Sequence, residues 1–479
     1  MNELCDLSAV HLSGMIRSKE ISPAELIDNC IDRIESCDGK LNAMVTKNYE
    51  RAKEEAKLAE RKVLDGHNLG LLHGLPVGVK DLELTQGLRT TLGSKLYANY
   101  IPEEDQGSVA KIRAEGGILL GKTNTPEFGA GANTRNLVFG ATGNPFDTLK
   151  TCGGSSGGSA VALATGMVPI ATGSDYGGSL RTPASFCGVV GIRPSPGVVP
   201  AEARPVALLP FSVLGPMART VDDAYLLLQA QSGVNRLDPF SNGADADFCK
   251  KLEPADLSNI NAMITPDLGS AVMSKKYRSI FAKRAQLFSH NFKSVNYENP
   301  NFENGDNCFE ILRGVNFVAA HGQRVRNNRK ELSPNVLDNV DRGRQYTLED
   351  VAVAHLQQSK ISRDWINLLN RIDVVICPAT ATTPFLHSEW SVNEIDDIRM
   401  DTYMRWLGIT YLPTMALACG VTIPCGLDHA SMPFGIQVLG APGDDSLVIA
   451  VAKSIETVLS QNSSSVRPIP NITQLQNTN

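Results

Sequence analysis

The sequence predicts an α/β protein with a mixed, largely open central sheet that helices cover on both faces. Short apolar runs typical of buried strands, such as residues 77–79 and 118–120, alternate with stretches of helical spacing. The chain has 479 residues, of which 42% are hydrophobic and 20% charged. This composition is that of a globular protein with a sizeable core.

Residues 1–70 predict an N-terminal helical pair packed on the core. Residues 22–25 read Ser-Pro-Ala-Glu, a capping box with proline at the first helical position, and apolar residues follow at helical spacing. Residues 48–64 predict a second helix that is charged on one side. Together, the two helices are expected to cover part of a sheet.

Residues 71–235 predict the core of the fold. After the strands at 77–79 and 118–120, with a helix at 108–114 between them, the chain predicts a helix at 160–164 and a strand at 168–171. Such alternation of strands and helices indicates a sheet with helices on both faces.

The second half of the chain predicts three further segments. Residues 236–370 are richer in charge and asparagine and predict a variable helical cap or insertion that shapes a pocket. Residues 371–460 return to core character, with a strand at 373–378 and a closing helix at 445–459. Residues 461–479 are polar and are expected to fray.

Composition argues against several classes of function. The net charge of −6 argues against a direct nucleic-acid partner, and no apolar run is long enough to cross a membrane. The acidic start lacks a signal-peptide core, so the cytoplasm is the expected location. The ten cysteines form no Cys-x-x-Cys pair and the histidines show no ligand spacing, so we expect reduced thiols, no metal and no cofactor.

Two glycine–serine clusters and one lysine point to acyl transfer. Residues 153–159 read Gly-Gly-Ser-Ser-Gly-Gly-Ser, and residues 175–181 read Asp-Tyr-Gly-Gly-Ser-Leu-Arg. A serine on a glycine-rich turn can expose its hydroxyl beside free backbone N–H groups, and a buried lysine such as Lys80 can supply the base. Taken alone, the first cluster could equally be a linker, an anion-binding loop or a Gly-x-Ser-x-Gly nucleophile elbow.

The three segments together resemble the blocks of the amidase signature family. That resemblance implies a catalytic triad with Lys80 as base, Ser155 as proton relay and Ser179 as nucleophile. The two family serines lie 24 positions apart, which selects Ser155 over Ser156. The resemblance also implies a cis peptide bond at Gly154–Ser155. For Lys80 to accept a proton it must be neutral, and burial would lower its pKa toward neutrality.

The resemblance also implies how the second cluster stabilises the transition state. Backbone N–H groups of four successive residues would form the oxyanion hole: Tyr176, Gly177, Gly178 and Ser179. Asp175 and Arg181 flank this loop and would fix it through a charge-assisted contact. Tyr176, where many relatives carry a smaller residue, would line the substrate pocket or pack into the scaffold. Phe128 is a weaker pocket candidate.

The resemblance implies hydrolysis of a linear amide to a carboxylate and an amine or ammonia, with esters and carbamates as further substrates, through a seryl acyl-enzyme. The substrate would be a small molecule, and a homodimer is one assembly left open. One alternative is the glutaminase subunit of a tRNA-dependent amidotransferase, which works with a partner. A second is a Ser-His-Asp α/β-hydrolase centred on Ser155, and a third is a catalytically dead binding protein.

Overall fold

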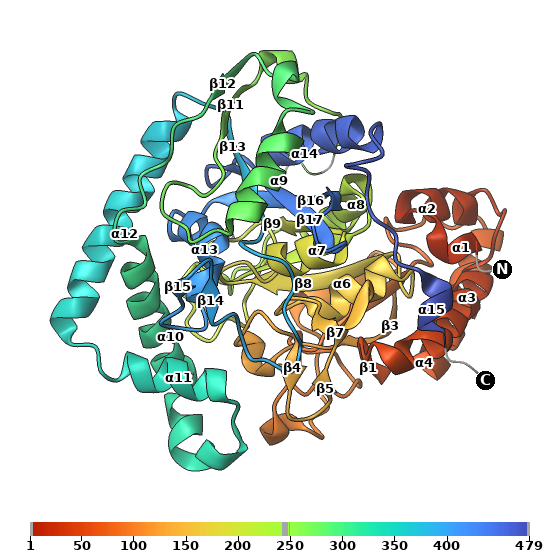
Figure 1. The fold of residues 1–479 in the computed structure, drawn as a ribbon. Coiled ribbons are helices and arrows are strands. Elements are labelled where there is room, and N and C mark those ends of the chain that lie inside the picture. The colour runs from red at the N-terminus through yellow and green to blue at the C-terminus, as the bar shows by residue number, and fades with distance from the viewer. Residues whose placement is uncertain (1–2, 242–247, 249, 477–479) are drawn as a thin grey trace.

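A computed structural model describes residues 3–241, 248 and 250–476. An eleven-stranded mixed sheet runs through the centre of the molecule (Figure 1). In spatial order its strands are β1 (Met44–Lys47), β3 (Ile118–Thr123), β2 (Pro76–Lys80), β8 (Ile170–Asp175), β10 (Val213–Ala218), β9 (Val190–Arg193), β16 (Cys419–Leu427), β17 (Pro433–Gly440), β13 (Val374–Pro378), β11 (Asn261–Ile264) and β12 (Ser294–Asn296).

The sheet is mixed because its two ends contain parallel pairs and its middle is antiparallel. Strand β2 pairs parallel with both β3 and β8, while β11 pairs parallel with β12 and β13. Between them β10, β9, β16 and β17 pair antiparallel with their neighbours. The central strands are buried along nearly their whole length, as expected where helices cover both faces. The predicted fold class is confirmed.

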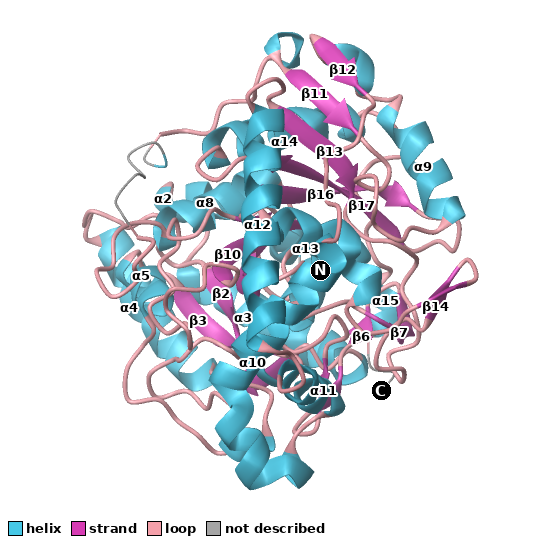
Figure 2. Cartoon of the chain, turned by 90° about the vertical axis from the view of Figure 1, so that its left-hand side faces the viewer, coloured by secondary structure: helices cyan, strands magenta, loops and turns pink. Residues whose placement is uncertain are grey.

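Helices pack on the sheet in two groups. Helices α6 (Gly157–Ala164) and α7 (Arg181–Cys187) contact each other and the central strands, and both follow directly on a glycine–serine cluster. The second group is α5 (Gly107–Ala114), α8 (Val221–Gln231) and α14 (Asp445–Ser460), in which α8 contacts both of the others and each helix contacts strands of the sheet (Figure 2).

The N-terminal helices lie beside the β1 end of the sheet. The expected pair is α3 (Pro23–Cys37) and α4 (Tyr49–Leu64), which pack together and against β2 and β3. Ser22 caps α3 by accepting a hydrogen bond from the Glu25 N–H at 3.0 Å, as the capping box predicts. Two shorter helices precede them: α1 (Glu3–Asp6) and α2 (Ala9–Arg17).

Residues 236–370 contain more than the expected helices. They form α9 (Lys275–Ala285), α10 (Gly305–Asn328), α11 (Pro334–Gly343) and α12 (Leu348–Leu369). They also contribute β11 and β12 to one end of the central sheet, which the sequence analysis did not anticipate. The two strands are short, and their apolar runs are too brief for periodicity to separate a strand from a helix. The segment is therefore joined to the core through the sheet, and α10 to α12 extend from it (Figure 1).

The C-terminal segment also differs from expectation. The described residues after 460 pack on the molecule instead of fraying, and α15 (Ile472–Leu475) lies beside α3 (Figure 1). Leu475 is buried, and Lys40 Nζ donates to the carbonyl oxygens of Gln474 and Gln476 at 3.0 and 2.8 Å. These contacts help to hold a largely polar segment in place.

The remaining elements are short. They are helix α13 (Gly408–Met415) and the two-stranded ladders β4 (Arg135–Asn136) with β5 (Gly140–Ala141), β6 (Gly143–Asn144) with β7 (Asp147–Thr151), and β14 (Glu394–Ile395) with β15 (Ile398–Arg399). Within the described part of the chain, none of the helices combines the length and apolar character that crossing a membrane requires.

Candidate active site

The candidate site lies where β2 and β8 end side by side. Lys80 is the last residue of β2, and β8 ends at Asp175, immediately before the second glycine–serine cluster. These strands are parallel neighbours, so their carboxyl ends, and the loops that follow, meet at one edge of the sheet. The first cluster reaches the same edge at the start of α6.

Lys80 is completely buried and is surrounded by hydroxyl groups. Its Nζ lies within hydrogen-bonding distance of three serine oxygens: Ser155 Oγ at 2.8 Å, Ser156 Oγ at 2.8 Å and Ser174 Oγ at 2.9 Å. Burial lowers the pKa of Lys80 from 10.5 to about 7, although the negative charges of Glu83 and Asp175 oppose that shift. A substantial fraction of the amine is therefore neutral near pH 7.

The first cluster brings Ser155 to the lysine through an unusual backbone. The Gly154–Ser155 peptide bond is cis, as the resemblance implied. Ser155 is 2% exposed, and Gly129 approaches it so closely that an added Cβ would lie 3.4 Å from Ser155 Oγ. Ser156, the neighbour that the spacing argument set aside, contacts Lys80 at the same distance as Ser155.

Ser156 also joins the two clusters. Its N–H donates to the carbonyl oxygen of Ser179 at 3.2 Å, and its hydroxyl donates to the carbonyl oxygen of Ser174 at 3.3 Å. Ser179 is half-buried, and its hydroxyl forms no hydrogen bond with another described residue. The structure thus places Ser179 on a loop tied directly to the cluster that holds Ser155.

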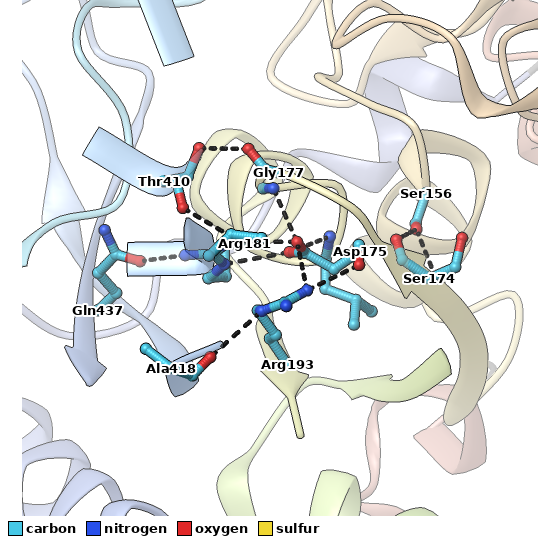
Figure 3. A network of polar contacts seen from close by, with 12 residues as sticks. Ser156, Ser174, Asp175, Gly177, Arg181, Arg193, Thr410, Ala418 and Gln437 are labelled. Atoms are coloured by element: carbon cyan, nitrogen blue, oxygen red, sulfur yellow. Dashed lines mark hydrogen bonds and ion pairs between the residues drawn. The ribbon is translucent and has the colours of Figure 1, made fainter. Parts of the chain in front are cut away.

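The loop of the second cluster is organised around the carboxylate of Asp175 (Figure 3). The expected contact with Arg181 is present in bidentate form, with two N···O distances of 3.1 Å. Arg193, which the sequence analysis did not single out, adds a second guanidinium at 3.2 Å. The same carboxylate accepts the N–H groups of Gly178 at 2.8 Å and Leu180 at 3.1 Å.

Charge compensation explains why this buried carboxylate stays ionised. Burial by itself would raise the pKa of Asp175, but Arg181, Arg193 and the Gly178 N–H together hold it well below its usual range. Burial in turn lowers the pKa of Arg193 to about 10. Arg181 also donates hydrogen bonds to Gln437 at 3.1 Å (Figure 3) and to Thr414 at 3.0 Å.

One of the expected oxyanion donors is already occupied. The Gly178 N–H donates to Asp175, so it is not a free donor, contrary to the expectation that all four N–H groups face the substrate. No hydrogen bond to a described residue engages the N–H groups of Tyr176, Gly177 or Ser179. Gly178 itself has a φ of +127°, and Thr410 holds the loop from the other side by donating to the Gly177 carbonyl oxygen at 2.8 Å.

A small pocket opens beside this loop. Its lining comes from four parts of the chain: Gly129, Gly131, Ala132, Gly154, Tyr176, Gly177, Gly178, Ser179, Arg313, Met404 and Leu407. Tyr176 combines the two roles expected of it, because it lines the pocket and its ring packs edge-to-face on Phe211 and Phe309. Its hydroxyl accepts a hydrogen bond from Asn316 Nδ2 at 3.2 Å.

Phe128 lies next to the pocket-lining Gly129 but is not itself among the lining residues. Its half-buried ring stacks on His321 of α10, with ring centroids 4.6 Å apart. The described residues include no group of three or more histidine, cysteine or acidic side chains placed to hold a metal ion. The nine described cysteines are all buried and free.

Several site residues escaped the sequence analysis. Ser174 could have been found, because Thr172 and Ser174 are two positions apart on β8 and therefore lie on the same face of the strand. Thr172 Oγ1 accepts a hydrogen bond from the Lys80 N–H at 3.0 Å. No sequence motif around Arg193 or Arg313 marks either residue as part of the site. Each reaches the site from a distant element, and only the tertiary fold brings them there.

A buried amine bonded to serine hydroxyls, next to a glycine-rich loop with free N–H groups, is the arrangement expected of an acyl-transfer enzyme. A model of the amidase family matches residues 25–449, and the chain belongs to that family of amide-hydrolysing enzymes. It is 31% identical to one subunit of the glutamyl-tRNA(Gln) amidotransferase of Geobacillus kaustophilus, over 95% of this chain and 97% of the relative.

Two further relatives are similar along their whole lengths. The chain is 29% identical to an acylamidase of Rhodococcus erythropolis, over 94% of this chain and 95% of the relative. The crystal structure of a bacterial aryl acylamidase of the amidase signature family superposes with a TM-score of 0.87 at 28% identity, covering 94% of this chain and 96% of that one.

Proposed function

We propose that this amidase cleaves linear amides through an acyl-enzyme on Ser179, with Ser155 as proton relay and Lys80 as base. The observation that carries the proposal is the 2.8 Å contact between Lys80 Nζ and Ser155 Oγ in a fully buried setting. A lysine of ordinary pKa would be neutral in only about one molecule in three thousand at pH 7. With a pKa of about 7, roughly half of the molecules carry a competent base.

The three hydroxyls around Lys80 match the hydrogen-bonding capacity of a neutral amine. A neutral amine has two N–H groups and one lone pair, so it can donate to Ser156 and Ser174 while it accepts from Ser155. Ser155 can then take the proton of Ser179 and pass its own proton to Lys80 as the Ser179 oxygen attacks the carbonyl carbon. Protonated Lys80 returns the proton through Ser155 to the nitrogen of the leaving amine.

Negative charge develops on the carbonyl oxygen during the attack. The free N–H groups of Tyr176, Gly177 and Ser179 would stabilise that charge. Losing one donor of this kind typically costs about 3–4 kcal/mol of transition-state stabilisation. Asp175 supports these donors indirectly, because its hydrogen bond with the intervening Gly178 N–H fixes the loop that carries them. The site thus needs no ligand beyond the chain itself for this chemistry.

The purified chain alone should release 4-nitroaniline from simple acyl 4-nitroanilides. Replacing Ser179 or Ser155 with alanine, or Lys80 with methionine, should lower kcat by several orders of magnitude. Ser159→Ala is the matched control, because Ser159 belongs to the same cluster but bonds to Thr123 and the Thr172 carbonyl instead of to Lys80. Full activity in the Ser179→Ala variant would rule the proposal out and favour a nucleophile at Ser155.

A second candidate follows from the relative in Geobacillus kaustophilus, which belongs to a glutamyl-tRNA(Gln) amidotransferase. In that case the chain would release ammonia from L-glutamine and would work within a complex. Ammonia release from glutamine that depends on a copurifying second chain would support this candidate. Anilide hydrolysis by a chain that copurifies with no second chain would count against it.

A further inference from the structure

The pocket beside Ser179 contains a single charged residue. Arg313 lies on α10, is only 4% exposed and lines the pocket together with Ser179. Every other lining residue is glycine, alanine, an apolar side chain, Tyr176 or Ser179 itself. Arg313 is therefore the one lining side chain that can form an ion pair with a substrate.

Neutral groups hold the Arg313 guanidinium in place. Its Nε donates to Asn339 Oδ1 at 2.9 Å, and its Nη2 donates to the Tyr403 hydroxyl at 2.9 Å. Its plane lies against the rings of Tyr176 and Phe317, with centroid distances of 5.0 and 4.5 Å. No described residue accepts a hydrogen bond from its Nη1, which leaves that nitrogen for a ligand.

Arg313 has no ion-pair partner within the described part of the chain. Other buried arginines of the site differ, because Arg181 and Arg193 share the carboxylate of Asp175. The carboxylate nearest along α10, Glu310, instead accepts a hydrogen bond from Thr402 at 2.6 Å. A buried charge without a counter-ion is costly, and a planar guanidinium favours bidentate contact with a carboxylate.

We infer that the substrate carries a carboxylate, which binds to Arg313 while the amide lies at Ser179. The inference rests on the proposed function and adds a substrate class to it: small amides with a negatively charged group a few bonds from the scissile bond.

The test compares charged and neutral substrates of the same shape. One pair carries the charge on the acyl side: glutaric acid mono-4-nitroanilide and its terminal carboxamide. The other carries it on the amine side: 4-acetamidobenzoate and 4-acetamidobenzamide. In at least one pair the wild type should favour the carboxylate by about tenfold or more in kcat/KM, mainly through KM.

Variants separate recognition from structural support. Arg313→Met should abolish the preference, because kcat/KM falls more on the carboxylate substrate than on its neutral partner, and Arg313→Lys should restore part of it. Arg324→Met is the matched control, since Arg324 is also on α10 and lies over the Tyr97 and Phe128 rings but does not line the pocket. Equal losses on charged and neutral substrates in Arg313→Met, or no preference in either pair, would overturn the inference.

A binding measurement keeps this test independent of turnover. Calorimetry with glutarate and with 4-aminobenzoate should detect binding of at least one of them to the wild type, weakened about tenfold or more in Arg313→Met. Absence of binding by both would overturn the inference even if the enzyme hydrolyses neutral anilides. Binding without hydrolysis of any substrate would instead count against the proposed function.

Discussion

The pH dependence of catalysis follows directly from the burial of Lys80. The lysine must be neutral to accept a proton, and its pKa is about 7, so kcat/KM should rise with pH and reach half its maximum near pH 7. Below that pH, activity should fall about tenfold per pH unit. Lowering a lysine pKa from 10.5 to about 7 corresponds to roughly 5 kcal/mol of preference for the neutral form.

The assay is the initial rate of 4-nitroanilide hydrolysis between pH 5.5 and 9, with stability checked at each pH. Lys80→Arg keeps a positive charge that does not titrate in this range, so it should lower kcat by about 10² to 10⁴ and remove the ascending limb. A wild-type kcat/KM that is constant from pH 6 to 9, or that reaches half its maximum only near pH 10, would refute the assignment of Lys80 as base.

Two further substitutions test the loop that carries Ser179. Asp175→Asn keeps the shape of the side chain but leaves Arg181 and Arg193 without their shared carboxylate. It should therefore lower the free energy of unfolding by about 3–5 kcal/mol, measured by thermal and urea unfolding. Unchanged unfolding would contradict the role of the carboxylate. Gly178→Ala should lower kcat at least tenfold, because the φ of Gly178 is +127° and an added Cβ would lie 2.3 Å from Thr410 Oγ1. Circular dichroism should show that the variant keeps its fold. A kcat equal to that of the wild type would contradict the required geometry.

The sequence was sufficient to predict the fold class, several strands of the sheet and residues that meet at its edge. Apolar runs located β2, β3 and β8, and the motif blocks located Lys80, Ser155 and the loop after Asp175. The strands depend on local periodicity, which a single sequence records directly, whereas the roles of Lys80 and Ser155 follow from the resemblance to the amidase signature family.

Features that depend on distant contacts could not be predicted in the same way. The occupied N–H of Gly178 follows from the orientation of the Asp175 carboxylate, which Arg193 helps to fix from another strand. Arg313 comes from a helix far along the chain. The edge strand β12 has only three residues, too few for a periodic signal.

The central claim is that Ser179, activated through Ser155 and Lys80, attacks the carbonyl group. It is tested most directly by intact-protein mass spectrometry with a fluorophosphonate probe on the wild type and single variants, followed by peptide mapping of the adduct. The account predicts one adduct on Ser179, none in Ser179→Ala and much slower labelling in Ser155→Ala and Lys80→Met. Labelling that persists in Ser179→Ala but disappears in Ser155→Ala would contradict it.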